Sequence, residues 1–222
     1  MGENIRLTAT DGHELGAWLS EPTGSPHGAI VVAMEMYGVN DYLRNVCETY
    51  AADGYVAITP QFFDRFAPDV TFPYDGSAYD QAKVYSADSV PHIVADAEAA
   101  KAHVSGAGKV AISGYCFGGT VTWLAACRSN FDAAIAYYGS NMCDYPDEEA
   151  RCPIIAHVGD QDTAVPPADV AMFKERRPEC IWHIYPGVLH GFDNATRAER
   201  YNADASKLAR ERTMKFLERH IG

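Results

Sequence analysis

The chain has 222 residues, of which 47% are hydrophobic and 22% charged, and its formal net charge is −12 at pH 7. This composition argues against a disordered or a membrane-spanning chain, and the length suits one domain with a full-sized core. The acidic balance argues against nucleic acid and anionic membrane surfaces as partners. It leaves the substrate open, because the local charge of a pocket can oppose the overall sign.

The first residues contain no apolar stretch of signal-peptide length, and no apolar run approaches the ~18 residues of a transmembrane helix. The cysteines are irregularly spaced and include no Cys-x-x-Cys pair: Cys47, Cys116, Cys127, Cys143, Cys152 and Cys180. All but Cys116 are interpreted as buried small hydrophobic residues in a reducing compartment. We therefore expect a cytoplasmic protein that needs no metal and no organic cofactor.

The predicted elements alternate along the chain after an initial hairpin, which pairs residues 6–9 with 14–20 and turns at Asp11-Gly12. Apolar, mostly β-branched runs predict strands, and periodic apolar stripes predict helices. The strands lie at 29–34, 55–60, 109–112, 133–138, 153–158 and 180–185, and the helices at 41–53, 88–104, 120–127, 166–176 and 198–218. This order predicts one α/β domain over residues 1–222, a three-layer sandwich with helices on both faces of a mostly parallel central sheet.

Residues 61–87 interrupt this rhythm with a long irregular excursion that is rich in aromatic residues. Such an insertion in a compact domain is more often functional than not, so we interpret it as a pocket wall and lid. The alternative is an aromatic surface loop packed on the core. Phe63 and Tyr85 of this segment, with Tyr37 and Tyr138 from strand ends, are the candidate pocket residues.

The motif Gly114-x-Cys116-x-Gly118 joins a predicted strand to a predicted helix and has the spacing of a nucleophile elbow. Glycines are needed on both sides because side chains there would collide with the strand and the helix. The helix N-terminus favours a thiolate at Cys116. The alternative is a structural cysteine; Ser113 is an unsuitable nucleophile because it precedes the first glycine of the turn.

Acidic and histidine residues follow two later strands, in the order Cys, Asp, His that is typical of α/β-hydrolase triads. Asp160 and Asp162 follow the strand 153–158, and His190 follows the strand 180–185. Asp162 is favoured as the triad acid because Gly159-Asp160 forms the turn first, although either aspartate could simply cap it. His190 could instead be a surface histidine of its loop.

These residues predict acyl transfer through a thioester. Cys116 attacks a carbonyl, His190 moves the proton and later activates water, and Asp162 holds the imidazole. The backbone N–H groups of Phe117 and Met36 are the candidate oxyanion donors.

Glu35 follows six apolar positions and should lie near the core, where an unpaired carboxylate is costly. One interpretation is an ion pair with Arg44 or Arg65. The other is a partner for the thiol of Cys116.

Over essentially its whole length, from Asp11-Gly12 to Leu217, the chain resembles the dienelactone hydrolase family of α/β-hydrolases. The resemblance rests on Glu35-Met36-Tyr37-Gly38-Val39-Asn40, Gly114-Tyr115-Cys116-Phe117-Gly118-Gly119, Tyr137-Tyr138-Gly139, Gly159-Asp160-Gln161-Asp162 and His190-Gly191-Phe192. It implies the α/β-hydrolase fold and a Cys116–Asp162–His190 triad. It also implies that Glu35 pairs with the thiol and acts as a gate, which would limit idle oxidation of Cys116.

The chain departs from the family where dienelactone-specific enzymes bind the substrate carboxylate with arginines. Asn194 and Gly191 stand where an arginine and a serine are expected, and residues 77–88 contain no arginine. We therefore expect a more apolar acyl or lactone pocket and a hydrolase of small-molecule carboxylic esters or lactones, as a monomer or homodimer. Alternatives are a redox-sensing or non-catalytic member of the fold using Cys116, and a metal-dependent hydrolase using Asp160, Asp162 and His190.

Overall fold

The computed structural model describes residues 2–222, which build one continuous eight-stranded sheet in the order β1-β2-β4-β3-β5-β6-β7-β8. The strands are β1 Glu3–Thr8, β2 Glu14–Ser20, β3 Gly28–Ala33, β4 Tyr55–Pro60, β5 Val110–Tyr115, β6 Ala133–Tyr137, β7 Ile154–Gly159 and β8 Cys180–Tyr185. The hairpin β1–β2 is antiparallel and also meets β4 antiparallel, whereas β3 to β8 pair in parallel. The predicted α/β class with a mostly parallel sheet is therefore confirmed.

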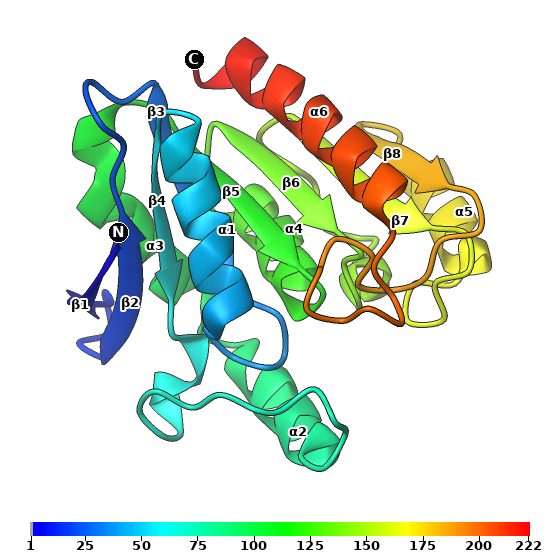
Figure 1. Ribbon diagram of the computed structural model, residues 1–222, viewed down its shortest axis with the longest axis horizontal. Coiled ribbons are helices and arrows are strands. Elements are labelled where there is room, and N and C mark those ends of the chain that lie inside the picture. Colours follow the sequence, from blue (N-terminus) through cyan, green and yellow to red (C-terminus); the bar gives the residue numbers. More distant parts are fainter. Residues whose placement is uncertain (1) are drawn as a thin grey trace.

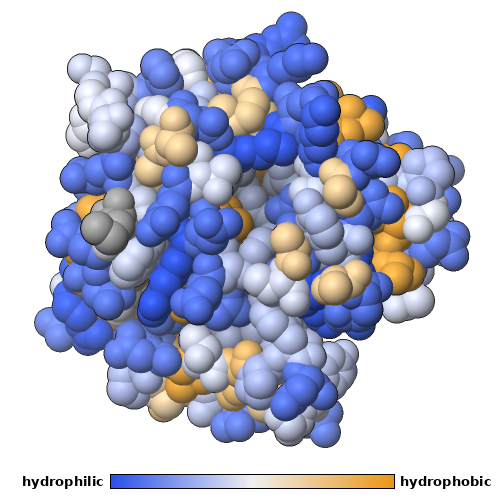
Figure 2. Space-filling model, viewed as in Figure 1, coloured by the Kyte–Doolittle hydropathy of each residue, from blue (hydrophilic) through white to orange (hydrophobic). Residues whose placement is uncertain are grey.

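The helices cover both faces of this sheet, as Figure 1 shows: α1 and α6 lie on the near face, and α3, α4 and α5 lie behind. Their bounds are α1 Asp41–Ala52, α2 Tyr79–Ser89, α3 Ile93–Val104, α4 Phe117–Arg128, α5 Pro167–Arg176 and α6 Ala203–His220; short 3₁₀ turns span η1 Phe62–Arg65, η2 Ser105–Ala107 and η3 Met142–Asp144. Among residues 2–222, no helix combines the length and the apolar character needed to cross a membrane. The face seen in Figure 2 is largely hydrophilic, with hydrophobic residues in small groups.

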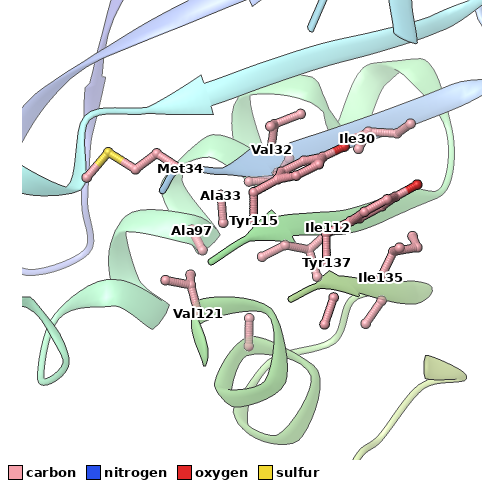
Figure 3. Packing of buried hydrophobic residues seen from close by; sticks show 14 of the residues in the cluster. Ile30, Val32, Ala33, Met34, Ala97, Ile112, Tyr115, Val121, Ile135 and Tyr137 are labelled. Atoms are coloured by element: carbon pink, nitrogen blue, oxygen red, sulfur yellow. The ribbon is translucent and has the colours of Figure 1, made fainter. Parts of the chain in front are cut away.

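The central strands are buried along their whole length because helices cover both sides of them. Successive side chains of a strand point to opposite faces, so each strand supplies both layers of the core. Figure 3 shows Tyr115 and Tyr137 side by side on β5 and β6, where their rings stack 4.7 Å apart. The sheet is thereby a rigid frame for the loops at the carboxyl ends of its strands.

The structure corrects the predictions for residues 61–104. Residues 61–87 are not irregular throughout, because α2 begins at Tyr79; this helix buries only Ala82 and Ser89, so it lacks the apolar stripe by which helices are recognised. The helix expected at 88–104 is interrupted at Pro91, which lacks a backbone N–H, and α3 begins only at Ile93. Figure 1 shows this region extending beyond the end of β4.

The last helix also begins later than the expected residue 198. The Asn202 side chain accepts the N–H of Ala205 and so caps α6 at its true N-terminus. Residues 191–202 instead form a series of turns beyond β8. This difference matters for the site, because it brings two arginines of that segment to the cavity described below.

Candidate active site

Cys116 lies at the sharp turn between β5 and α4, with φ +55° and ψ −117°. Positive φ is uncommon for residues other than glycine, and a strained backbone of this kind clusters at functional sites. A Cβ at Gly114 would overlap the Gly118 carbonyl, and one at Gly118 would overlap the Ala33 carbonyl of β3. The two glycines are therefore required by close backbone contacts, as the elbow motif predicts.

The Cys116 backbone is fixed by the last residue of β6 and by the loop that follows it. Its N–H donates to the Tyr137 carbonyl at 3.0 Å, and its carbonyl accepts the Ser140 N–H at 3.2 Å. The thiol lies 3.6 Å from the Ser140 hydroxyl, a contact that the sequence did not suggest. The candidate nucleophile is thus held by two neighbouring strand ends.

His190 and Asp162 meet beyond β7 and β8: the imidazole Nδ1 lies 2.8 Å from the Asp162 carboxylate. The other Asp162 oxygen accepts the N–H groups of Ala164 and Val165, at 2.8 and 2.9 Å. Asp160 points elsewhere and accepts the Gly187 N–H at 2.7 Å. The structure therefore joins Asp162, not Asp160, to His190, and leaves imidazole Nε2 available on the other side of the ring.

The electrostatics of this pair favour a charged imidazole. Burial alone would lower the pKa of His190, but the adjacent Cys116 sulfur and the Asp162 carboxylate outweigh it and raise that pKa to about 10. The order of the three groups is then sulfur, imidazole, carboxylate. Such an arrangement can hold a thiolate beside an imidazolium and move a proton between sulfur and a bound substrate.

Glu35 lies at the end of β3 and is only 1% exposed. The Tyr74 hydroxyl donates to its Oε2 at 2.5 Å, the Tyr138 hydroxyl lies 3.4 Å from Oε1, and the Asn194 amide lies 3.4 Å from Oε2. Burial raises the pKa of Glu35 even though these hydrogen bonds oppose the shift. Within residues 2–222 its hydrogen-bond partners are these groups and not the thiol.

The ion pair suggested for Glu35 is wrong for both arginines. Arg65 binds Asp96 through Nη2 at 2.7 Å and Nε at 2.9 Å, and Asp11 through Nη1. Arg44 of α1 lies over the Trp18 ring of β2, 5.0 Å from its centroid. Both guanidinium groups are therefore engaged away from the site.

A cavity of about 770 Å³ opens over Cys116 and His190, and Met36, Tyr37 and Phe117 contribute to its wall. Of the predicted pocket residues, Tyr37 alone lines it. Phe63 and Tyr138 are fully buried behind the wall, and Tyr85 packs against Phe63. The aromatic side chains of these segments fill the core instead of facing the cavity, and Tyr138 stacks edge-on to the His190 ring at 5.1 Å.

Three cations line the same cavity, which corrects the expectation of an apolar pocket: Lys83 from α2, and Arg197 and Arg200 from the turns after His190. A Cβ at Gly191 would lie 4.0 Å from Arg197 Nη1 and 3.9 Å from Arg200 Cδ, so both side chains pass beside the residue that follows His190. These arginines do not stand four residues after His190, the spacing expected from the family. The sequence signals for these cations are the arginines seven and ten positions after His190 and the lysine within residues 77–88.

A parallel sheet with a nucleophile elbow after β5, an acid after β7 and a histidine after β8 defines the class as an α/β-hydrolase. The dienelactone hydrolase family model matches residues 15–221. The carboxymethylenebutenolidase of Pseudomonas putida is 33% identical over 97% of this chain and 95% of the relative.

Two solved structures share the fold. One is a dienelactone hydrolase-like promiscuous phosphotriesterase from metagenomic libraries, with a TM-score of 0.80, 18% identity and coverage of 100% and 99%. The other is a thermophilic esterase of Thermogutta terrifontis, with a TM-score of 0.69, 18% identity and coverage of 97% and 91%. The chain belongs to the dienelactone hydrolase family and is a hydrolase that acts on esters or lactones.

Proposed function

We propose that this enzyme cleaves small carboxylic esters or lactones through a Cys116–His190–Asp162 triad and a thioester acyl-enzyme. The observation that carries the proposal is the placement of Cys116 at a strained elbow, in one cavity with a His190 that is bonded to Asp162 at 2.8 Å. Each feature alone has a structural explanation. Together they supply a nucleophile, a proton carrier and an orienting acid.

In the first half-reaction, the Cys116 thiolate attacks the carbonyl carbon, and the oxyanion forms beside the Met36 and Phe117 N–H groups. Both residues line the cavity, and Phe117 begins α4, so its N–H has no acceptor within the helix. The intermediate then expels the alkoxide or enolate. His190 gives this leaving oxygen its proton, and the thioester remains.

The second half-reaction depends on the charge that acylation removes. In the thioester the sulfur is neutral, so it no longer raises the pKa of His190, and the neutral imidazole becomes available as a base. It takes a proton from water as the hydroxide attacks the thioester carbon. The thiolate leaves, and the carboxylic acid product gives up its proton to solvent.

We further propose that the substrate carries a carboxylate, which Arg197, Arg200 and Lys83 attract. Arg197 is 8% exposed and lies over the Tyr74 ring at 4.9 Å, so its guanidinium is positioned before a ligand arrives. The name of the Pseudomonas putida relative denotes a lactone with a carboxyl-bearing side chain, which agrees with this charge. Residues 61–87 would form the wall and lid of the pocket. The enzyme would act in the cytoplasm as a monomer or homodimer.

The triad is tested with Cys116→Ala and His190→Ala, each assayed on small activated esters and enol-lactones. We expect kcat to fall by at least ~10³-fold in both, because the nucleophile or its proton carrier is lost. Cys180→Ala is the matched control, since this buried cysteine lies outside the cavity. Intact mass after trapping with a slow ester should locate the acyl group on Cys116; undiminished turnover by Cys116→Ala would refute the mechanism.

The substrate class is tested with Arg200→Gln, because this arginine is partly exposed and contributes little to the core. We expect KM for a carboxylate-bearing lactone to rise by about 10-fold or more, as charged hydrogen bonds contribute about 1.5–3 kcal/mol. KM for a neutral ester of equal size should stay within about twofold. Equal effects on both substrates would contradict a carboxylate subsite and leave the triad proposal standing.

A further inference from the structure

Two buried carboxyl groups, Glu35 and Asp193, are joined by an unbroken row of two tyrosine hydroxyls. Glu35 Oε1 lies 3.4 Å from the Tyr138 hydroxyl, which lies 3.1 Å from the Tyr42 hydroxyl, which in turn lies 3.0 Å from Asp193 Oδ2. The four residues come from the end of β3, the loop after β6, helix α1 and the turns after His190. The row therefore links the wall of the candidate active site to α1 and to the turns after His190.

The remaining contacts fix which oxygen of Glu35 can hold a proton. The amide oxygens of Asn40 and Asn194 each accept a backbone N–H, so both amide nitrogens donate to the Tyr74 hydroxyl at 2.9 Å. The Tyr74 hydrogen is then directed to Glu35 Oε2 at 2.5 Å. Oε2 is an acceptor, and any proton on Glu35 lies on Oε1, which faces Tyr138.

The number of hydrogens that the row needs determines how many protons its two carboxyl groups carry. The three contacts between Glu35, Tyr138, Tyr42 and Asp193 need three protons, and the two hydroxyls supply two. If both carboxyl groups were ionised, each tyrosine would donate outward, and the Tyr42 and Tyr138 oxygens would face each other at 3.1 Å without a hydrogen between them. One carboxyl proton, on either end, completes all three bonds in a consistent direction.

We propose that Glu35 and Asp193 share a single proton through a relay formed by Tyr138 and Tyr42. In one direction, Glu35 Oε1 gives its proton to Tyr138, Tyr138 gives its own to Tyr42, and Tyr42 gives its own to Asp193 Oδ2. Three O–H bonds break and three form, both tyrosines stay neutral, and the negative charge moves from Asp193 to Glu35. Asp193 and Tyr42 are positioning residues, since they act on the site through Glu35.

The surroundings of each end are consistent with one shared proton. His190 and Arg197 face Glu35, Arg210 faces Asp193, and burial nevertheless raises the pKa of both carboxyl groups. Asp193 is partly exposed as a residue, but its oxygens are turned onto Tyr42 and the Ser206 hydroxyl, which is 2.5 Å from Oδ1.

The two hydroxyls of the row remain protonated. Burial raises the pKa of Tyr42 and Tyr138 well above that of a free phenol. Both tyrosines therefore keep the hydrogens that the count assigns to them.

The relay would adjust the charge beside the reacting sulfur without exchange with solvent. A negative charge on the sulfur during the proposed reaction would repel a charge on Glu35, which favours the proton on Glu35 and the charge on Asp193. Once the sulfur is acylated that repulsion ends, and the proton can move to Asp193, which leaves Glu35 negative beside His190. This role in turnover rests on the proposed triad, whereas the shared proton itself does not.

The test is ¹³C NMR of the free enzyme labelled at its Glu and Asp carboxyl carbons, with the two signals assigned by Glu35→Gln and Asp193→Asn. An asparagine amide at 193 can donate to Tyr42, so the row is complete with Glu35 ionised. We expect Asp193→Asn to lower the proton affinity of Glu35 by about 10-fold or more. In a Tyr42→Phe background, where the row is cut, the same substitution should change it less than about twofold.

Tyr50→Phe is the matched control, since it removes a buried hydroxyl of α1 that contacts Ser113 instead of the row. The coupling should survive it. If Tyr42→Phe fails to fold, the reciprocal measurement of Asp193 in Glu35→Gln decides, because coupling between two sites must be equal in both directions. Two ionised carboxyl groups at neutral pH, or coupling that persists without the Tyr42 hydroxyl, would overturn the proposal. These measurements involve no turnover, so neither result could arise from failure of the proposed triad.

Discussion

The two sides of the cavity are built differently. On one side, Cys116 and Asp162 are held by backbone hydrogen bonds at the ends of strands, within a frame that is buried throughout. On the other side, Lys83 and Arg200 reach the cavity as long side chains from α2 and from surface turns. Reacting atoms need fixed positions, whereas groups that select a substrate can tolerate movement. The proposed chemistry accordingly falls on the strand ends and the proposed selectivity on the long side chains.

The largest expected effect concerns Asp162, the proposed triad acid on the strand-end side of the cavity. Asp162→Asn should reduce kcat by ~10³- to 10⁴-fold with little change in KM, because the amide cannot hold the imidazole in the required tautomer. Asp160→Asn is the matched control, two residues away and bonded to the Gly187 N–H, and should keep activity within about threefold. Steady-state kinetics with one activated ester compares the two variants. Equal losses of kcat would indicate that activity depends on the whole turn and not on the contact between Asp162 and His190.

A second prediction tests the backbone of the elbow. Gly118→Ala would force a Cβ into the Ala33 carbonyl, so α4 must shift away from β3, and we expect a loss of roughly 3 kcal/mol or more in the free energy of unfolding. Gly106→Ala is the control, because nothing lies within 4 Å of its Cβ position. It should change stability by less than about 1 kcal/mol. Urea unfolding measures both, and a neutral Gly118→Ala would mean that the elbow is looser than described.

The smallest effect is electrostatic. In the free enzyme His190 should remain protonated up to about pH 10, because the Cys116 sulfur and Asp162 outweigh burial. In Cys116→Ala the sulfur no longer raises the pKa of His190. The midpoint of the His190 titration should therefore move to lower pH by at least about one unit, or about 1.4 kcal/mol. Imidazole ¹⁵N signals followed against pH give both values. An unchanged midpoint would show that the sulfur does not interact with the ring.

Much of the frame could be predicted from residue patterns because it depends on local rules. Buried β-branched runs specify the parallel strands, and Gly114 and Gly118 specify a turn that only glycine permits. The order of Cys116, Asp162 and His190 after successive strands indicates their proximity, since the carboxyl ends of parallel strands share one edge of the sheet. Helix α2 escaped prediction because it buries too little apolar surface to leave a periodic pattern.

What only the tertiary structure decided is how side chains from distant segments meet. Sequence spacing indicated a buried Glu35, but it could not select Tyr74 and Tyr138 as its partners, which lie 39 and 103 residues away. Nor could it bring Arg197 and Arg200 beside Gly191, because the turns after β8 set those directions. Local sequence determines the strands, the turns and which residues are candidates for reaction. The charges and hydrogen-bond partners around those residues arise only when the folded chain places remote groups within a few ångströms of one another.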